Sequence, residues 1–151
     1  MSLVFEKVIS AESQIEVLYG LLKGRSQNIS HEHTPLFEEH CNFVKSHPYC
    51  YWYLIKHHNF YIGTLYIKRD NSIGISLISG KERFFNKVVH FALKNHIPEP
   101  EVKSIIPSSF YINVSPKNQI FIDALNHGGA KLVQFTYMLD PLTLHKDLVN
   151  V

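Results

Sequence analysis

The pattern of apolar and polar residues divides the chain into short segments of helix or strand character. An apolar residue recurs every three to four positions, which is helical spacing, in residues 11–22, 34–46, 83–96 and 118–127. Runs rich in β-branched and aromatic residues cover 3–9, 51–57, 60–69, 72–78, 110–114 and 130–139. In chain order these segments predict β-α-α-β-β-β-α-β-α-β. We therefore expect an α/β fold with a mixed, mostly antiparallel central sheet flanked by helices.

Residues with turn and capping preferences mark the ends of these segments. Ser10 is a candidate N-cap for the first helix, and Thr34 followed by Pro35 predicts the start of the second. Residues 57–59 are expected to form a hairpin turn. Two glycines at 128–129 should end the last helix and allow a final strand to follow. No repeat or linker interrupts the pattern, so residues 1–151 are expected to form a single domain.

Composition and charge narrow the class of protein. The chain is 45% hydrophobic and 13% aromatic, which is typical of a globular domain with a full core. A formal net charge of +2 is too small to indicate a nucleic-acid or membrane partner. The first residues lack the basic and apolar segments of a signal peptide, so we expect a cytoplasmic protein. Cys41 and Cys50 are then expected to be reduced thiols.

The chain contains ten histidines, which raises the question of a metal site. The closest pairs are His31 with His33 and His57 with His58. Neither pair belongs to a zinc-finger spacing or to a His-Glu-x-x-His motif, so no metal is expected. Phosphate-loop, dinucleotide and serine-hydrolase motifs are absent from the sequence as well.

The segment from Phe110 to Leu139 carries the clearest resemblance to a known family. It combines a strand, a turn with Pro116, a helix opened by Asn118, a glycine pair and a second strand. This order resembles the C-terminal half of the GNAT superfamily of acetyl-CoA-dependent N-acetyltransferases. The element order of nearly the whole chain is similar to that family. Short stretches similar to a bacterial branch of it are 28–31, 38–40, 47–49, 52–55, 62–63, 66–67, 71–75 and 134–137.

The resemblance implies transfer of an acetyl group from acetyl-CoA to a primary amine of a small molecule or amino sugar. The alternative is a non-catalytic module of the same fold that binds an acyl-CoA or a protein partner. A homodimer is compatible with either function. In the family, acetyl-CoA lies between two splayed strands, which the resemblance places at 73–78 and 110–114. We expect these strands to be adjacent and to diverge at their C-terminal ends.

The family also binds the cofactor pyrophosphate on a glycine-rich turn at a helix N-terminus, where free amides and the helix dipole favour an anion. The corresponding turn here, residues 82–87, has no glycine. Three interpretations stay open: charged side chains replace the backbone contacts, acetyl-CoA binds weakly or in another pose, or catalysis has been lost. By resemblance, the cofactor-binding residues are Leu77, Ile78, Ser79, Lys81, Arg83, Phe84, Phe85, Asn86, Lys87, Asn113 and Asn118.

The resemblance also implies roles in the chemical step. Backbone amides at Leu77 and Ile78 are expected to stabilise the oxyanion. The position of the family's general-acid tyrosine is occupied by Leu125, which cannot donate a proton. Candidates for the general base are His31, His33, Glu38 and Glu39, in the region that covers the acceptor pocket in the family. The ordinary alternative is that these four are solvated residues of a loop and a helix surface.

Overall fold

The computed structural model describes residues 2–25 and 33–143 and contains a five-stranded sheet. The strand order is β1 (Val4–Lys7), β2 (Tyr51–His57), β3 (Phe60–Ile67), β4 (Ser72–Leu77) and β5 (Tyr111–Ile112). The first four strands pair antiparallel, and β5 pairs parallel to β4. This confirms the expected α/β class with a mixed, mostly antiparallel sheet.

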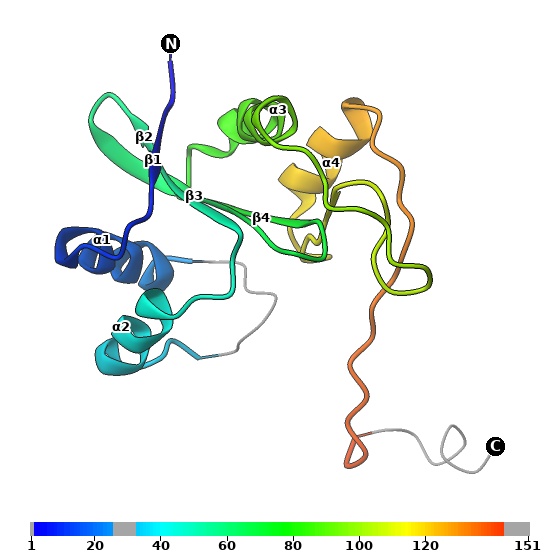
Figure 1. Ribbon diagram of the computed structural model, residues 1–151, viewed down its shortest axis with the longest axis horizontal. Coiled ribbons are helices and arrows are strands. Elements are labelled where there is room, and N and C mark those ends of the chain that lie inside the picture. The colour runs from blue at the N-terminus through cyan, green and yellow to red at the C-terminus, as the bar shows by residue number, and fades with distance from the viewer. Residues whose placement is uncertain (1, 26–32, 144–151) are drawn as a thin grey trace.

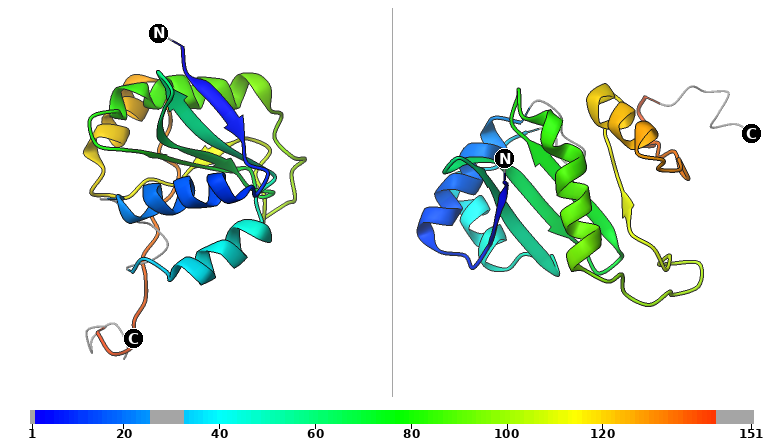
Figure 2. Two further views of the ribbon diagram at one scale, coloured as in Figure 1. Left: turned by 90° about the vertical axis from the view of Figure 1, so that its left-hand side faces the viewer. Right: turned by 90° about the horizontal axis from the view of Figure 1, so that it is seen from above.

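Helices cover both faces of this sheet (Figures 1 and 2). On one face lie α1 (Glu12–Lys23) and α2 (Phe37–Lys45). On the other lies α3 (Phe85–Asn95), which follows a single 3-10 turn, η1 (Glu82–Phe84). Beside α3 lies α4 (Gln119–His127), and the ring of Phe85 stacks on that of Phe121 at 4.1 Å. The result is a three-layer arrangement in which the sheet separates two apolar clusters.

The two clusters follow from the alternation of side chains along the strands. Leu54 and Ile55 are neighbours on β2, and both are fully buried, but they belong to different clusters. The cluster on the α3 side consists of Ile55, Ile62, Leu65, Ile67, Ile73, Phe84, Val88 and Ala92. The cluster on the α1 and α2 side consists of Val8, Ile15, Leu18, Val44, Trp52 and Leu54.

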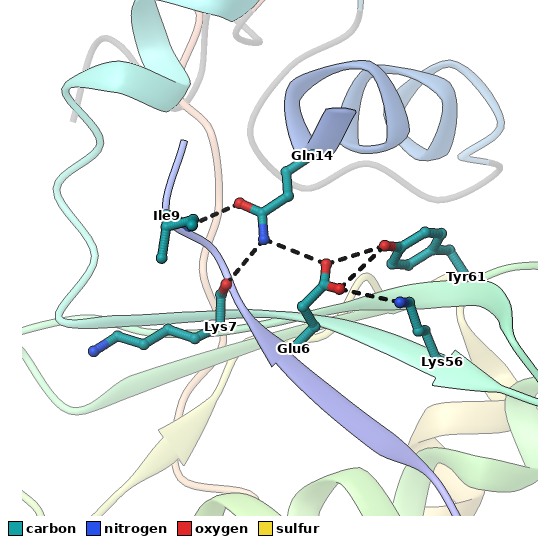
Figure 3. A network of polar contacts seen from close by, with 6 residues as sticks. All are labelled: Glu6, Lys7, Ile9, Gln14, Lys56 and Tyr61. Atoms are coloured by element: carbon teal, nitrogen blue, oxygen red, sulfur yellow. Dashed lines mark hydrogen bonds and ion pairs between the residues drawn. The ribbon is translucent and has the colours of Figure 1, made fainter. Parts of the chain in front are cut away.

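A polar network joins the end of β1 to the start of α1 (Figure 3). The amide of buried Gln14 accepts a hydrogen bond from the Ile9 backbone at 2.8 Å and donates to the Lys7 carbonyl at 3.0 Å. Its third contact is a hydrogen bond donated to the Glu6 carboxylate, which also accepts hydrogen bonds from Lys56 and Tyr61. Gln14 thus fixes the entry into α1 from inside the helix.

The predicted caps of the first two helices are wrong, each by one or two residues. Ala11 is the N-cap of α1, and Ser10 instead has φ 62° and donates its hydroxyl to the Val44 carbonyl. The N-cap of α2 is Leu36 rather than Thr34, because the Glu39 carboxylate accepts the Leu36 amide at 3.0 Å. At α1 the predicted cap, Ser10, instead contacts Val44 of α2. At α2 the Glu39 side chain, from within the helix, does the capping.

Other predicted boundaries are confirmed. β2 and β3 are joined by His58 and Asn59, both at positive φ (49° and 64°), as a two-residue hairpin turn requires. Asn118 is the N-cap of α4, and its Oδ1 accepts the Phe121 amide at 3.2 Å. Gly128 caps the other end, and Gly129 follows at φ 81°.

Asn71 connects the β3–β4 turn to the long segment that leads to β5. Its side chain is buried, donates to the carbonyls of Glu99 and Pro107, and accepts the Glu99 amide at 2.7 Å. Its backbone carbonyl accepts the Tyr111 amide at 3.2 Å. One residue therefore fixes both the loop of residues 96–110 and the start of β5.

The expected final strand, residues 130–139, does not form. This segment leaves α4 and runs away from the body of the molecule without pairing to any described strand (Figures 1 and 2). A β-rich sequence becomes a strand only when its backbone finds a partner. The prediction was wrong because the composition of a segment does not supply that partner.

Candidate active site between β4 and β5

The pairing of β4 with β5 is short, and this opens the sheet. Only Ser72 with Tyr111 and Ile73 with Ile112 are paired, whereas β4 continues to Leu77. Figure 2 shows β5 and α4 standing apart from the rest of the sheet. The expectation that the two strands are adjacent and then part is confirmed.

A pocket of about 790 Å³ lies at this opening, within the usual size range of small-molecule sites. Its walls come from the C-terminal end of α1, from α2, from β2 to β4, and from the segment between β5 and the first turn of α4. The lining residues that enter the argument below are Arg25, Glu39, His40, Tyr49, Trp52, Tyr66, Gly74, Leu77, Glu82, Asn113, Lys117 and Asn118.

The backbone of β4 supplies hydrogen-bond donors to this opening. Amides of an antiparallel strand point alternately to either side, and the Ile78 amide donates to the Ile62 carbonyl of β3 at 2.9 Å. Alternation then turns the Ile75 and Leu77 amides away from β3, toward the side where β5 has parted. The expected role of the Ile78 amide is therefore wrong, because β3 already uses it. Leu77 keeps the expected orientation and lines the pocket.

One wall of the pocket is aromatic. The rings of Tyr49 and Tyr66 stack at 4.2 Å, and Trp52 meets Tyr49 edge-on at 5.0 Å. Gly74 makes room for this arrangement: a Cβ there would lie 1.9 Å from the Tyr66 ring and 2.4 Å from its hydroxyl oxygen. The Tyr66 hydroxyl therefore lies directly against β4. Burial raises the pKa of Tyr49 to about 12 and also raises that of Tyr66, so both hydroxyls stay protonated at neutral pH and can donate hydrogen bonds.

A buried histidine of α2 also lines the pocket. His40 is 5% exposed, and its Nε2 lies 3.2 Å from the Ile15 carbonyl. A carbonyl only accepts, so Nε2 carries the proton and Nδ1 is the unprotonated nitrogen of the neutral ring. Burial lowers the pKa of His40, which keeps the ring neutral at pH 7. His40 can therefore accept a proton.

Charged groups of both signs line the same pocket. Arg25 lies near Tyr49 and Tyr66, and its Nε is buried without a hydrogen-bond partner among residues 2–25 and 33–143. Burial lowers the Arg25 pKa, but a guanidinium stays charged at neutral pH. Glu39 lines the pocket while capping α2, and Glu82 lines it at the start of η1. The pocket is thus both aromatic and charged.

The glycine-free turn adopts a compact helical entry. The Lys81 amide donates to the Ile78 carbonyl, and the Phe84 amide donates to the Lys81 carbonyl. Phe84 and Phe85 are 3% and 1% exposed, and their rings face the core rather than solvent. Only backbone groups of these two residues could meet a phosphate. Glu82 and Arg83 begin the helical turn, so no earlier helical turn offers a carbonyl to their backbone amides.

The basic residues of this turn lie away from the pocket lining. Arg83 sits over the Phe84 ring at 4.8 Å, and Lys87 over the same ring at 5.8 Å. Burial and His58 lower the pKa of His57 most, and Lys81 and Arg83 lower it further. Lys81 and Arg83 therefore lie near the β2–β3 turn. Ile78, Ser79 and Asn86 are exposed. A cation that does line the pocket is Lys117, beside Asn118 at the start of α4.

Some of the site residues predicted from the sequence line this pocket, and others do not. Leu77, Asn113, Asn118, His33 and Glu39 line the pocket. Glu38 is exposed on α2 and is not among the described lining residues. His31 lies outside the described residues. The sequence reasoning missed Arg25, His40, Tyr49, Tyr66, Glu82 and Lys117.

Some of the missed residues left a signal in the sequence. Gly74 in the middle of a β-rich run indicates a close approach by another group, and the tyrosine of β3 is that group. Lys117 lies within the Pro116–Asn118 turn that the resemblance had already singled out. Arg25 and His40 left no comparable signal, since a basic residue after a helix and a histidine on one face are common.

No group of three or more histidine, cysteine, aspartate or glutamate side chains within residues 2–25 and 33–143 is arranged to hold a metal ion. None of the helices in these ranges is both long and apolar enough to cross a bilayer.

Comparison with known proteins bears on the fold. The crystal structure of a possible acetyltransferase from Clostridium difficile 630 superposes with a TM-score of 0.57 at 9% sequence identity. The superposition covers 96% of this chain and 100% of the other. No protein-family model and no curated protein matches the sequence. The likeness shows a shared fold, with the five-stranded sheet flanked by helices as described above.

Proposed function

We propose that this protein is an acetyl-CoA-dependent N-acetyltransferase that acts on a primary amine of a small molecule or amino sugar. The observation that carries the proposal is the parting of β4 and β5 after Ile73, with a pocket of about 790 Å³ at the opening. The likeness to a possible acetyltransferase supports it through the shared fold. The acceptor class is an extension from the family resemblance.

The pantetheine arm of acetyl-CoA needs a row of backbone groups, and β4 offers one. With β5 parted, the Ile75 and Leu77 amides face the opening without a partner strand. The thioester carbonyl gains negative charge during attack, and an amide fixed in this position stabilises it without reorganisation. Asn113 and Asn118 stand on the opposite wall, with the Lys117 ammonium beside them.

The attacking amine must lose a proton before it bonds to the thioester carbon. Glu39 and His33 are the sequence-predicted bases that line the pocket, and the neutral His40 is a further acceptor there. When the carbon–sulfur bond breaks, the thiolate takes a proton. With Leu125 in the family's acid position, the Tyr66 hydroxyl against β4 is the donor we assign. The Tyr66 oxygen then regains a proton from the protonated base, so the proton lost by the amine ends on the thiol of CoA.

Titration calorimetry with acetyl-CoA tests the binding step. We expect weaker binding than in a relative with a glycine-rich turn, because the backbone at Phe84 and Phe85 does not allow the close approach of a phosphate that glycine gives. Asn118→Ala should reduce affinity by more than its N-cap contribution of about 1 kcal/mol would explain. The control is Asn126→Ala, at the far end of α4. Unchanged affinity with a lower melting temperature would restrict Asn118 to capping.

Salt dependence tests which groups hold the phosphates. Exposed charges are screened over about 8 Å at physiological ionic strength, so an affinity that depends on lysines falls as salt rises. Lys117→Ala should reduce that salt dependence, whereas Lys45→Ala on α2 should not. Salt-insensitive binding would instead indicate that backbone amides hold the phosphates.

The second candidate is a non-catalytic module of the same fold, and the glycine-free turn is the observation that favours it. Acetyl transfer to a panel of amines and amino sugars separates the two. Turnover that is lost in Tyr66→Phe while acetyl-CoA affinity is retained supports the enzyme. Absence of binding at millimolar acetyl-CoA would decide for the non-catalytic candidate.

A further inference from the structure

One cation of the pocket lacks an acidic partner within the described part of the chain. Arg25 follows the end of α1 and lines the pocket, and its Nε is buried without a hydrogen-bond partner among residues 2–25 and 33–143. The ion pair found in these ranges joins Lys56 to Glu6, so the Arg25 guanidinium pairs with neither Glu39 nor Glu82. A charge removed from water is costly unless acceptors meet it, so we expect an anion beside Arg25.

The surroundings of Arg25 suit a small molecule that carries this anion. Burial lowers the pKa of Arg25, and the nearby Tyr66 and Tyr49 hydroxyls raise it. Burial also lowers the pKa of His40, and the charge of Arg25 lowers it further. Arg25 therefore lies near both the stacked tyrosines and His40. The protonated tyrosine hydroxyls are hydrogen-bond donors to an anion in this position, and their rings offer an apolar surface to the rest of the molecule.

The shape and charge of the Arg25 side chain favour a carboxylate over a phosphate. A guanidinium presents a planar fork of donors that matches the two oxygens of a carboxylate. Its single positive charge balances one negative charge, and Lys117 stands on the opposite wall of the pocket. A phosphate monoester carries nearly two negative charges, and it would add the second to a pocket that already holds Glu39 and Glu82.

The position of this cation along β4 separates its anion from the cofactor phosphates. The Tyr66 ring lies against Gly74, which comes one residue before Ile75 and three before Leu77. The strand rises about 3 to 10 Å over these steps to the two amides that face the opening. The turn at 82–87, where the resemblance places the pyrophosphate, comes after Leu77. The phosphates and the anion at Arg25 therefore lie on opposite sides of the reacting centre, and the side of Arg25 is the one left for the acceptor.

We propose that the amine acceptor carries a carboxylate, which Arg25 binds while the Tyr49 and Tyr66 rings contact the rest of the molecule. The inference rests on the proposed acetyl transfer and narrows its acceptor to small amino acids, whose amine and carboxylate are a few bonds apart. Neutral amino sugars lack the anion. The carboxylate takes no part in the bond changes: the carbon–sulfur bond breaks, the carbon–nitrogen bond forms, and the amine proton ends on the thiol of CoA.

Trp52 fluorescence measures acceptor binding without requiring acetyl transfer. Trp52 is the only tryptophan of the chain, is 7% exposed, and lines the pocket beside Tyr49. The probes are alanine, phenylalanine, β-alanine and 4-aminobutyrate, each compared with its own amide, with and without CoA. We expect at least one acid to bind about tenfold or more tightly than its amide. Equal affinity within every pair, or no fluorescence change with any acid, would overturn the proposal.

Variants of Arg25 show whether this side chain causes the preference. Arg25→Gln removes the charge and should reduce the ratio of acid to amide affinity to about one, whereas Arg25→Lys keeps the charge without the planar fork and should retain part of the preference. The matched control is Lys23→Gln, an exposed cation two residues earlier that is not among the described lining residues. A urea transition confirms that each variant is folded. A preference that survives in Arg25→Gln would overturn the assignment.

Acetyl transfer from acetyl-CoA to the same probes separates this inference from the proposed function. Acids that bind through Arg25 and are not acetylated would support the carboxylate site and count against acetyl transfer. Acetylation by a wild type that shows no preference for acids would support acetyl transfer and overturn the carboxylate site. O-phosphoethanolamine is the phosphate counterpart of β-alanine, and tighter binding of this probe than of every acid would overturn the choice of a carboxylate.

Discussion

Asn71 offers the sharpest test of how the site is held in place. It is 1% exposed, sits at φ 68°, and makes three side-chain hydrogen bonds of 2.7 to 3.0 Å to Glu99 and Pro107. Asn71→Ala removes all three and places an alanine in the left-handed region. We expect this variant to lose stability and also to loosen the segment that leads to β5.

The expected loss of stability has two contributions, the lost hydrogen bonds and the strained left-handed backbone. Each hydrogen bond contributes about 0.5–1.5 kcal/mol net, and the values here belong to the lower half because Glu99 and Pro107 are themselves exposed. The left-handed backbone adds about 1 kcal/mol for a residue other than glycine or asparagine. Together these terms predict a loss of about 3 kcal/mol, or about 6–12 °C in melting temperature for a chain of this size.

Asn71→Gly separates the two terms, because glycine adopts the same backbone without strain and lacks the hydrogen bonds. We correct the free energy of unfolding in urea for the flexibility of glycine in the unfolded chain. The corrected value for Asn71→Gly should then exceed that of Asn71→Ala by about 1 kcal/mol, the cost of the left-handed backbone for alanine. Both variants should bind acetyl-CoA more weakly, since Tyr111 and the β5 wall lose their anchor. If both stay within 1 kcal/mol of the wild type, the anchoring argument is refuted.

Three further outcomes are expected. Gly74→Ala should cost about 1–3 kcal/mol because its Cβ displaces the Tyr66 ring, and Tyr66→Ala in the same chain should make the combined loss smaller than additive in urea unfolding. Stability should fall as pH drops below the ordinary histidine pKa of about 6.5, because unfolded chains take up a proton there while burial lowers the pKa of folded His40. His40→Gln should make the urea midpoint depend less steeply on pH, and the remaining slope belongs to His47, His57 and His96, whose pKa values burial also lowers. Phe121→Ala should cost about 3–5 kcal/mol by leaving the Phe85 ring without its stacking partner, and thermal unfolding that changes by less than 1 kcal/mol would contradict that contact.

Local chemistry in the sequence determined most of the elements. The β2–β3 hairpin follows from two β-rich runs separated by residues that tolerate positive φ, and the structure places His58 and Asn59 there. Asn118 and the two glycines set the ends of α4 through their own backbone and side-chain preferences. The GNAT resemblance further predicted that β4 and β5 would meet and part, because element order constrains which strands are neighbours.

Tertiary structure decided what depends on contacts between distant residues. Ser10 does not cap α1, because Val44 takes its hydroxyl and Gln14 takes the Ile9 amide. The Ile78 amide is unavailable to a ligand because the sheet register gives it to Ile62.

The same holds for the pocket and for residues 130–139. His40 and Tyr66 come from α2 and β3, and only packing brings them to one pocket. The β-rich segment after α4 shows the limit most directly. Sequence specifies that residues 130–139 prefer an extended conformation, but a strand also requires a second backbone, and its identity is a property of the assembled structure.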